Sequence, residues 1–155
     1  MATNYRTMEC EPRHVFEVLG NGWLYPGWVV GASRMRGVDE AWPAPSSALH
    51  HSFGVWPVLL NDATSMLEWD PPRHALLKAR AWPVGEAHVT IDVRETENGC
   101  RVRMIEDTVA GPARFVPGAV RESMVHARNV ETLHRLAYLA EGKAKAERKS
   151  AEGKA

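Results

Sequence analysis

The sequence has few cysteines, no net charge and no long apolar stretch, and each absence argues against a class of protein. Two cysteines, Cys10 and Cys100, are too few for a disulfide scaffold. A formal charge of zero argues against nucleic acid or an anionic membrane as the main partner, because both favour a basic surface. No apolar run approaches transmembrane length, and residues 1–10 contain no apolar signal-peptide core. We therefore expect a cytoplasmic protein with no nucleic-acid partner and no stable membrane insertion.

Motifs of the common catalytic centres are also missing. There is no glycine-rich phosphate loop, no Gly-x-Ser-x-Gly nucleophile motif and no set of His, Cys, Asp and Glu residues at metal-ligand spacing. His50 and His51 come nearest to a metal site, but neighbouring residues of a strand point to opposite faces of a sheet. The sequence therefore predicts neither a metal nor a cofactor.

The length of 155 residues suits one domain. We predict that the domain covers residues 1–142 and that residues 143–155 form a charged tail. This tail has five basic and two acidic residues and no apolar residue larger than alanine. Such a segment buries too little surface to offset the entropy lost on ordering, so we expect it to be disordered.

The residue pattern predicts one helix near the start, then strands, then a long helix. Pro12 suits the first turn of a helix over residues 11–20, and Gly20 suits its end. Turn-forming pairs such as Asn61-Asp62 and Asn98-Gly99 separate the expected strands. Short connections favour antiparallel pairing. The expected strands cover residues 3–9, 29–38, 48–56, 63–69, 74–81, 87–95 and 101–109.

The last strands show apolar residues at every second position, which gives the sheet one apolar face. Val89, Ile91 and Val93 alternate with polar residues, as do Val102 and Met104. A sheet with one apolar face needs a cover. We expect a long amphipathic helix over residues 116–142 to provide it, ending at Gly142. Its apolar stripe would be Val120, Met124, Ala127, Val130, Leu133, Ala137 and Ala140.

Four segments make the chain resemble a known superfamily. They are residues 12–19, residues 25–32, Gly111 after residues 104–106, and residues 128–136. With this order of elements, residues 3–142 resemble the SRPBCC superfamily, which includes START domains, birch-pollen-allergen-like proteins and polyketide cyclase/dehydrase-like proteins. The resemblance implies an α+β helix-grip fold, in which a seven-stranded curved antiparallel sheet wraps around a long C-terminal helix. It also implies a cavity for an apolar molecule, but it fixes no reaction, because a fold does not fix a function.

Glu106 is the most informative polar residue. It continues the inward series of Val102 and Met104, so a carboxylate faces the concave side of the sheet. A buried carboxylate needs a partner or a raised pKa. Arg128 on the covering helix is the first candidate partner and His51 the second. The alternative is that Glu106 lies at the rim of the sheet, either in contact with water or in a structural ion pair.

Six apolar residues are predicted to line the cavity beside these polar groups. The alternative is that the same side chains fill a solid core. We expect a ligand-binding set made of Glu106, His51 and Arg128 together with Trp28, Phe53, Leu77, Ile91, Met104 and Met124.

These residues leave three functions open. The first is binding of an apolar small molecule, such as a lipid, a polyketide or an aromatic metabolite. The second is a polyketide cyclase or dehydratase that uses Glu106 as acid or base, with His51 or Arg128 polarising a carbonyl. The third is a protein-interaction module. A monomer and a homodimer are both compatible with the sequence. The helix-grip fold also pairs the first and last strands, which would place Cys10 near Cys100; we expect two free thiols.

Overall fold

The structure is a computed structural model, and it describes residues 1–81, 85–110 and 118–153. The side chains of residues 55, 81, 110 and 118–122 are outside this description. Seven strands form one sheet, with the spatial order β1-β7-β6-β5-β4-β3-β2. All neighbouring strands are antiparallel. The strands are β1 (Ala2–Met8), β2 (Ala32–Val38), β3 (Ala48–Val55), β4 (Val58–Asp70), β5 (His74–Ala81), β6 (Gly85–Thr96) and β7 (Gly99–Ala110).

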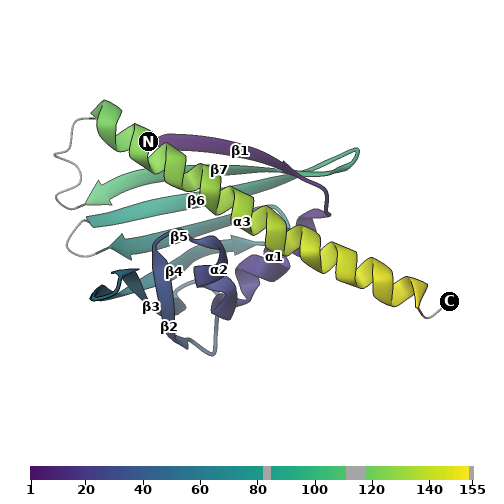
Figure 1. Cartoon of the computed structure of the whole chain (residues 1–155), viewed down its shortest axis with the longest axis horizontal. Helices are drawn as coiled ribbons and strands as arrows, with labels where there is room; N and C mark the ends of the chain where they lie inside the picture. The colour runs from purple at the N-terminus through teal and green to yellow at the C-terminus, as the bar shows by residue number, and fades with distance from the viewer. Residues whose placement is uncertain (82–84, 111–117, 154–155) are drawn as a thin grey trace.

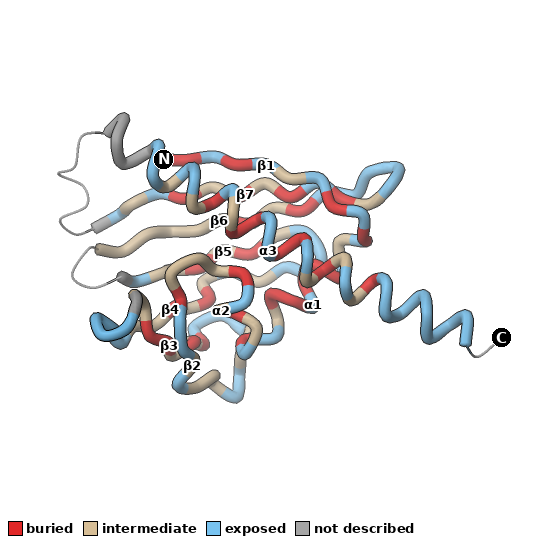
Figure 2. Tube along the Cα trace, viewed as in Figure 1, coloured by how far each residue is buried: buried red, intermediate tan, exposed pale blue. Residues whose placement is uncertain are grey.

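The helices lie on one face of this sheet (Figure 1). The helix α1 (Pro12–Gly20), the short 3-10 helix η1 (Gly22–Leu24) and α2 (Tyr25–Trp28) connect β1 to β2. The long helix α3 (Gly118–Glu152) crosses the sheet and contacts β1, α1 and α2. Buried residues concentrate where α3 and α1 face the sheet (Figure 2). The fold is therefore the predicted seven-stranded antiparallel sheet with a long C-terminal helix packed against it.

The local signals that predicted α1 agree with its packing. The helix has proline in its first turn, and its apolar side chains Val15, Phe16, Val18 and Leu19 are all buried. The ring of Phe16 lies 5.1 Å from that of Trp69 on β4, measured between centroids. These contacts fix the helix layer against the sheet and close one end of the core.

The β3–β4 hairpin differs from the prediction. We expected a turn at Asn61-Asp62, but β4 begins at Val58, and the turn falls at Trp56 and Pro57. Asn61 lies opposite Ser52 in the ladder, and its Oδ1 accepts a hydrogen bond from the Ser52 hydroxyl at 3.0 Å. Cross-strand pairing therefore overrides the turn preference of these two residues, and the hairpin is about five residues longer than expected.

The apolar stripe of α3 is also partly different from the prediction. Leu133, Ala137 and Ala140 are buried as expected, and Val120 lies outside the described side chains. The other predicted members, Met124, Ala127 and Val130, are exposed. The buried face instead includes Asn129, Thr132, Leu136 and Ala144. The stripe was misplaced because polar residues occupy part of the inward face near the pocket.

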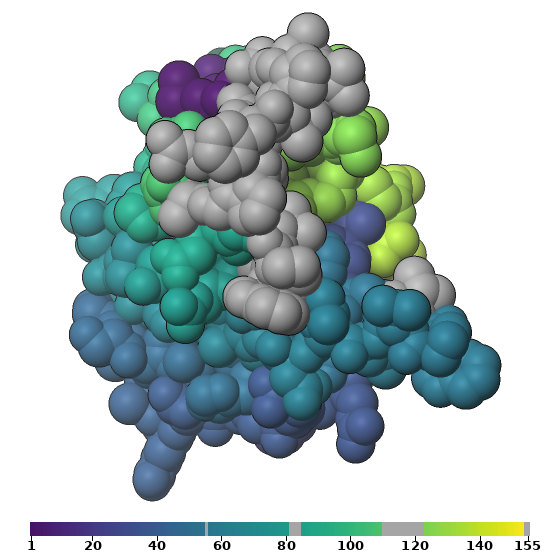
Figure 3. All heavy atoms as spheres, turned by 90° about the vertical axis from the view of Figure 1, so that its left-hand side faces the viewer, coloured from purple at the N-terminus to yellow at the C-terminus, as the bar shows by residue number. Residues whose placement is uncertain are grey.

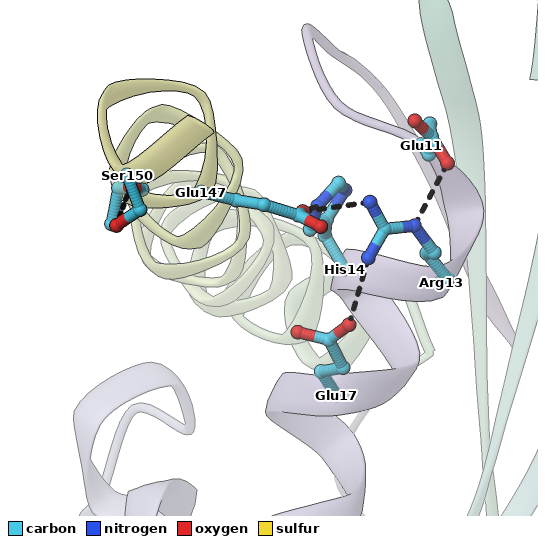
Figure 4. A network of polar contacts seen from close by, with 7 residues as sticks. Glu11, Arg13, His14, Glu17, Glu147 and Ser150 are labelled. Atoms are coloured by element: carbon cyan, nitrogen blue, oxygen red, sulfur yellow. Dashed lines mark hydrogen bonds and ion pairs between the residues drawn. The ribbon is translucent and has the colours of Figure 1, made fainter. Parts of the chain in front are cut away.

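The predicted end of the long helix at Gly142 is wrong. The helix α3 continues to Glu152, and Ala144 is buried. Glu147 accepts one hydrogen bond from Arg13 and pairs with His14, at 2.7 Å in each case (Figure 4). Arg13 holds the pKa of Glu147 below its ordinary value, with a second contribution from His14. Where a disordered tail was expected, residues 143–152 form a helix that contacts α1.

Truncation after Gly142 is therefore expected to lower the melting temperature by about 3–6 °C, because it removes the Ala144 packing and leaves buried His14 without its partner. Glu147→Gln should lower it less. The exposed Glu152, changed to Gln, is the matched control and should have no effect. Thermal unfolding followed by circular dichroism measures all three. An unchanged melting temperature on truncation would support the tail that the sequence predicted.

Candidate functional site

A pocket lies between the concave face of the sheet, α2 and α3. Its volume is about 420 Å³. The lining is mainly apolar and comes from every layer of the fold. Small side chains, Ala32 on β2, Ala79 on β5 and Ala87 on β6, leave room where larger residues would fill the core. The pocket lining reaches the ends of β5 and β7, at the end of the molecule that faces the viewer in Figure 3.

Most of the predicted site residues line this pocket. Ile91 does not: it is fully buried in the core, opposite Met104 in the β6–β7 ladder. Met104, its partner in the ladder, does line the pocket and is 2% exposed. The residues that do line it are Trp28, His51, Phe53, Leu77, Met104, Glu106, Met124 and Arg128.

Met124 lies at the rim of the pocket. Its side chain is 68% exposed, although it touches the pocket space. The predicted apolar stripe of the covering helix would instead have buried Met124 against the sheet. A substitution of Met124 would therefore change the entrance and leave the interior unfilled.

Gly31 shapes the wall next to Phe53. Its φ of +102° lies in the region that favours glycine, and the Phe53 ring occupies the space that a Cβ at this position would need. Any larger residue would displace the ring. The backbone between α2 and β2 thus depends on glycine to bring Phe53 to the pocket.

Glu106 and Arg128 form the predicted ion pair. Arg128 Nη2 donates a hydrogen bond to Glu106 Oε2. The Glu106 side chain is 7% exposed, whereas that of Arg128 is 34% exposed. Strand alternation aims Glu106 inward from β7, and α3 brings Arg128 over it. The pair neutralises the carboxylate inside an apolar wall and leaves part of the Arg128 side chain exposed.

Asn129 is tied to the same pair. Its Oδ1 accepts a hydrogen bond of 3.2 Å from Arg128 Nη2, and its side chain is buried. Its Nδ2 has no hydrogen-bond partner among the described residues. The next helical turn contributes Thr132, whose Oγ1 accepts a hydrogen bond of 3.3 Å from the Val30 amide. The resulting polar strip on α3 replaces part of its expected apolar stripe.

A second polar group lies among β3, β4 and α2. His51 Nε2 and Thr64 Oγ1 are 3.0 Å apart, and the Tyr25 hydroxyl lies 2.8 Å from the same Oγ1. Burial lowers the pKa of His51 below its ordinary value, so the ring is neutral at pH 7. Burial also raises the pKa of Tyr25 to about 12. His51 is therefore bonded to Thr64 and is not the partner of Glu106.

The sequence prediction missed Tyr25, Thr64, Asn129 and Thr132 as pocket residues. Thr64 stands in an ordinary alternating strand, and Tyr25 begins a helix of only four residues. Asn129 directly follows the predicted site residue Arg128. Its position one residue after a pocket-facing arginine was the one available signal.

The lowered pKa of His51 makes stability depend on pH. Because burial disfavours the charged ring, the unfolded chain binds more protons here, and stability is lost as the pH falls below the ordinary histidine pKa of 6.5. One such group contributes at most about 1.4 kcal/mol per pH unit. In urea unfolding, the free energy of unfolding should fall less from pH 7.5 to pH 5.5 in His51→Gln than in the wild type. His134→Gln, at an exposed position of α3, should behave like the wild type.

The two cysteines are close together. The Cys10 and Cys100 thiols form a hydrogen bond, which lowers the pKa of Cys10, and both residues are buried and free. The pairing of β1 with β7 explains this, because Met8 lies opposite Cys100.

Within the described ranges, no group of three His, Cys, Asp or Glu side chains is arranged to hold a metal ion. Among the described helices, none is long and apolar enough to cross a membrane.

Comparison with known protein families shows to which family the chain belongs. Residues 2–141 match the family described as "Polyketide cyclase / dehydrase and lipid transport". The chain belongs to this family. The match spans the sheet and most of α3, which agrees with the SRPBCC resemblance of residues 3–142. A search of curated protein sequences found no match.

Solved structures show the same fold at low sequence identity. A protein from Chromobacterium violaceum is 17% identical, with a TM-score of 0.68 over 90% of this chain and 96% of that one. A protein of unknown function from Staphylococcus aureus is 10% identical, with a TM-score of 0.70 over 93% and 94%. The di-domain ARO/CYC StfQ from the steffimycin biosynthetic pathway is 11% identical, with a TM-score of 0.69 over 92% of this chain and 51% of that one.

Proposed function

We propose that the protein binds a hydrophobic small molecule, such as a lipid, a polyketide or an aromatic metabolite, in the pocket between the sheet and α3. One observation carries this proposal: an apolar-lined space of about 420 Å³ lies where α3 packs on the sheet. Protein interiors are normally close-packed, and this volume lies in the range of small-molecule sites. The family description, which includes lipid transport, supports the same function.

The polar groups of the pocket indicate what kind of head group such a ligand carries. Glu106 neutralises Arg128, and His51 is uncharged at pH 7, so these groups together provide no net charge. The Arg128 side chain is partly exposed to the pocket and carries N–H donors. A ligand with a neutral acceptor, such as a carbonyl oxygen, fits this arrangement better than a carboxylate, because the charge of Arg128 is already balanced.

Direct detection of a ligand tests the proposal. Native mass spectrometry of the purified protein should show a 1:1 complex with a co-purified apolar molecule, which organic extraction then identifies. After extraction, the neutral ketone dye 6-propionyl-2-dimethylaminonaphthalene should bind at one site with a blue-shifted emission. Absence of both a bound molecule and saturable dye binding would contradict the proposal.

The second candidate is an enzyme of the polyketide cyclase or dehydratase type, and one observation favours it. Polar groups reach the pocket from two sides, with Glu106 and Arg128 on one and His51 on the other. Glu106 is engaged in the ion pair with Arg128, so neutral His51 is the candidate base. A 3-hydroxyacyl N-acetylcysteamine thioester would then lose water to give the unsaturated thioester. Formation of that product, abolished in His51→Gln, would favour the enzyme over simple binding.

A further inference from the structure

We propose that the tip of the β3–β4 hairpin docks on the surface of a lipid bilayer that contains anionic phospholipid. The tip is defined here as residues 56–59. It consists of Trp56, Pro57, Val58 and Leu59 and lies in an uncharged apolar run, residues 53–60. Trp56 is 81% exposed and Val58 is 68% exposed. Contiguous apolar side chains at such exposure mark an interaction surface.

The tip projects from the end of the molecule where the pocket opens. In the antiparallel sheet, β3, β5 and β7 run in the same direction, so the hairpin turn and the last residues of β5 and β7 lie at one end. Pocket-lining residues reach this end through Arg80, Glu86 and Thr108. Figure 3 faces it and shows the hairpin segment protruding at the right. A surface that covers the tip therefore also approaches the pocket entrance.

The residues of the tip suit the membrane–water interface better than bulk water. Tryptophan is enriched at membrane–water interfaces, because its ring is apolar and its N–H stays hydrated. Two aliphatic side chains stand beside it, and the tip carries no charge that insertion would have to desolvate. Elements that lie at an interface typically insert about 5–10 Å, which a hairpin turn of this length reaches.

Arginines stand behind the tip at the height of the lipid head groups. Arg34 on β2 is exposed and lies opposite Ser52, four residues before Trp56. At about 3.3 Å per residue, Arg34 is about 13 Å from the tip. Arg36 follows, held by the carbonyls of His51 and Asp62. Asp62 lies on this flank next to Arg36, and Arg34 and Arg36 together carry two positive charges. The formal net charge of the whole chain is zero and therefore gives no sign of these arginines behind the tip.

Apolar tip, basic flank and adjacent pocket together fit a peripheral contact with a membrane. An apolar ligand at the mouth of the pocket would pass between bilayer and pocket with less exposure to water. The contact needs no spanning segment and is compatible with the lack of stable insertion expected from the sequence.

Co-sedimentation with vesicles of phosphatidylcholine containing 30% phosphatidylglycerol tests the proposal on the full chain. The wild type should pellet with the vesicles, and Trp56→Ser/Val58→Ser should lose at least about tenfold in partition coefficient. Trp23→Ser is the matched control, since Trp23 is 62% exposed on η1, away from the tip. All variants should keep the wild-type melting temperature and still bind the neutral dye in the absence of vesicles.

Arginine substitutions test whether the anionic phospholipid contributes to binding. Arg34→Gln should reduce partition about fivefold on these vesicles and little on pure phosphatidylcholine. Arg94→Gln, at an exposed position toward the opposite end of the sheet, is the control and should have no effect. Failure of the wild type to pellet, or equal pelleting of the tip variant, would overturn the proposal. So would light scattering that shows a wild-type dimer and a monomeric tip variant without vesicle binding, because the tip would then join two copies of this chain.

Discussion

Glu106→Gln is expected to lower the free energy of unfolding by about 2–4 kcal/mol. Removing one member of a buried ion pair typically costs about 3–5 kcal/mol, and the partial exposure of Arg128 reduces this. The glutamine leaves a positive charge against the apolar wall of the pocket. Arg128→Met should cost a similar amount, because it leaves the Glu106 carboxylate buried and unpaired. Urea unfolding at pH 7.5 measures both.

The double variant Glu106→Gln/Arg128→Met should recover part of the loss, because neither charge remains. Recovery of at least about 1 kcal/mol relative to the sum of the single losses would demonstrate the coupling. The pair Glu131 and Arg135 provides the control on the same helix: it has the same charges but both members are exposed. Replacing Glu131 and Arg135 should change the free energy of unfolding very little. Purely additive losses at Glu106 and Arg128 would show that the pair contributes nothing as a pair.

Ala79→Phe is expected to weaken binding of the neutral ketone dye by at least about tenfold. Ala79 lines the pocket on β5, next to Ala87 on β6, and the added ring would occupy the space where the ligand is proposed to lie. The cost in stability should be small, because the ring enters a cavity. Overpacking of a dense core would instead cost about 1–3 kcal/mol.

Ala127→Phe is the matched control for this experiment. It adds the same ring at an exposed position of α3, so dye affinity and stability should both stay at the wild-type value. Fluorescence titration gives the affinities, and urea unfolding gives the stabilities. Large destabilisation by Ala79→Phe with unchanged dye binding would place the dye outside the pocket.

Most of the sheet was predictable from the sequence because strand alternation is a local pattern. Val102, Met104 and Glu106 are all buried, as their period of two requires. The same period separated His51, which is buried, from His50, which pairs with Asp39 outside the core. The position of Glu106 followed from its own strand, and its partner followed from the need to neutralise a buried charge.

The errors came from places where long-range packing overrides local preference. Asn61 and Asp62 have turn propensity, but pairing with β3 keeps them in a strand. Gly142 and the charged residues after it suggest a helix end, but contact with α1 continues the helix. In each case the stabilising partner is distant in the chain, and a local reading of composition does not include it.

The sequence by itself determined the order of elements, the apolar face of the sheet and the inward carboxylate, because periods of two and 3.6 residues depend only on backbone geometry. Only the tertiary structure decided that space remains beside Ala79 and Ala87, that Thr64 joins His51 to Tyr25, and that the β3–β4 tip extends past the body. These features depend on how distant side chains fill, or fail to fill, a shared volume. Whether that volume is filled depends on the packing of the whole domain, and no single segment of the sequence determines it.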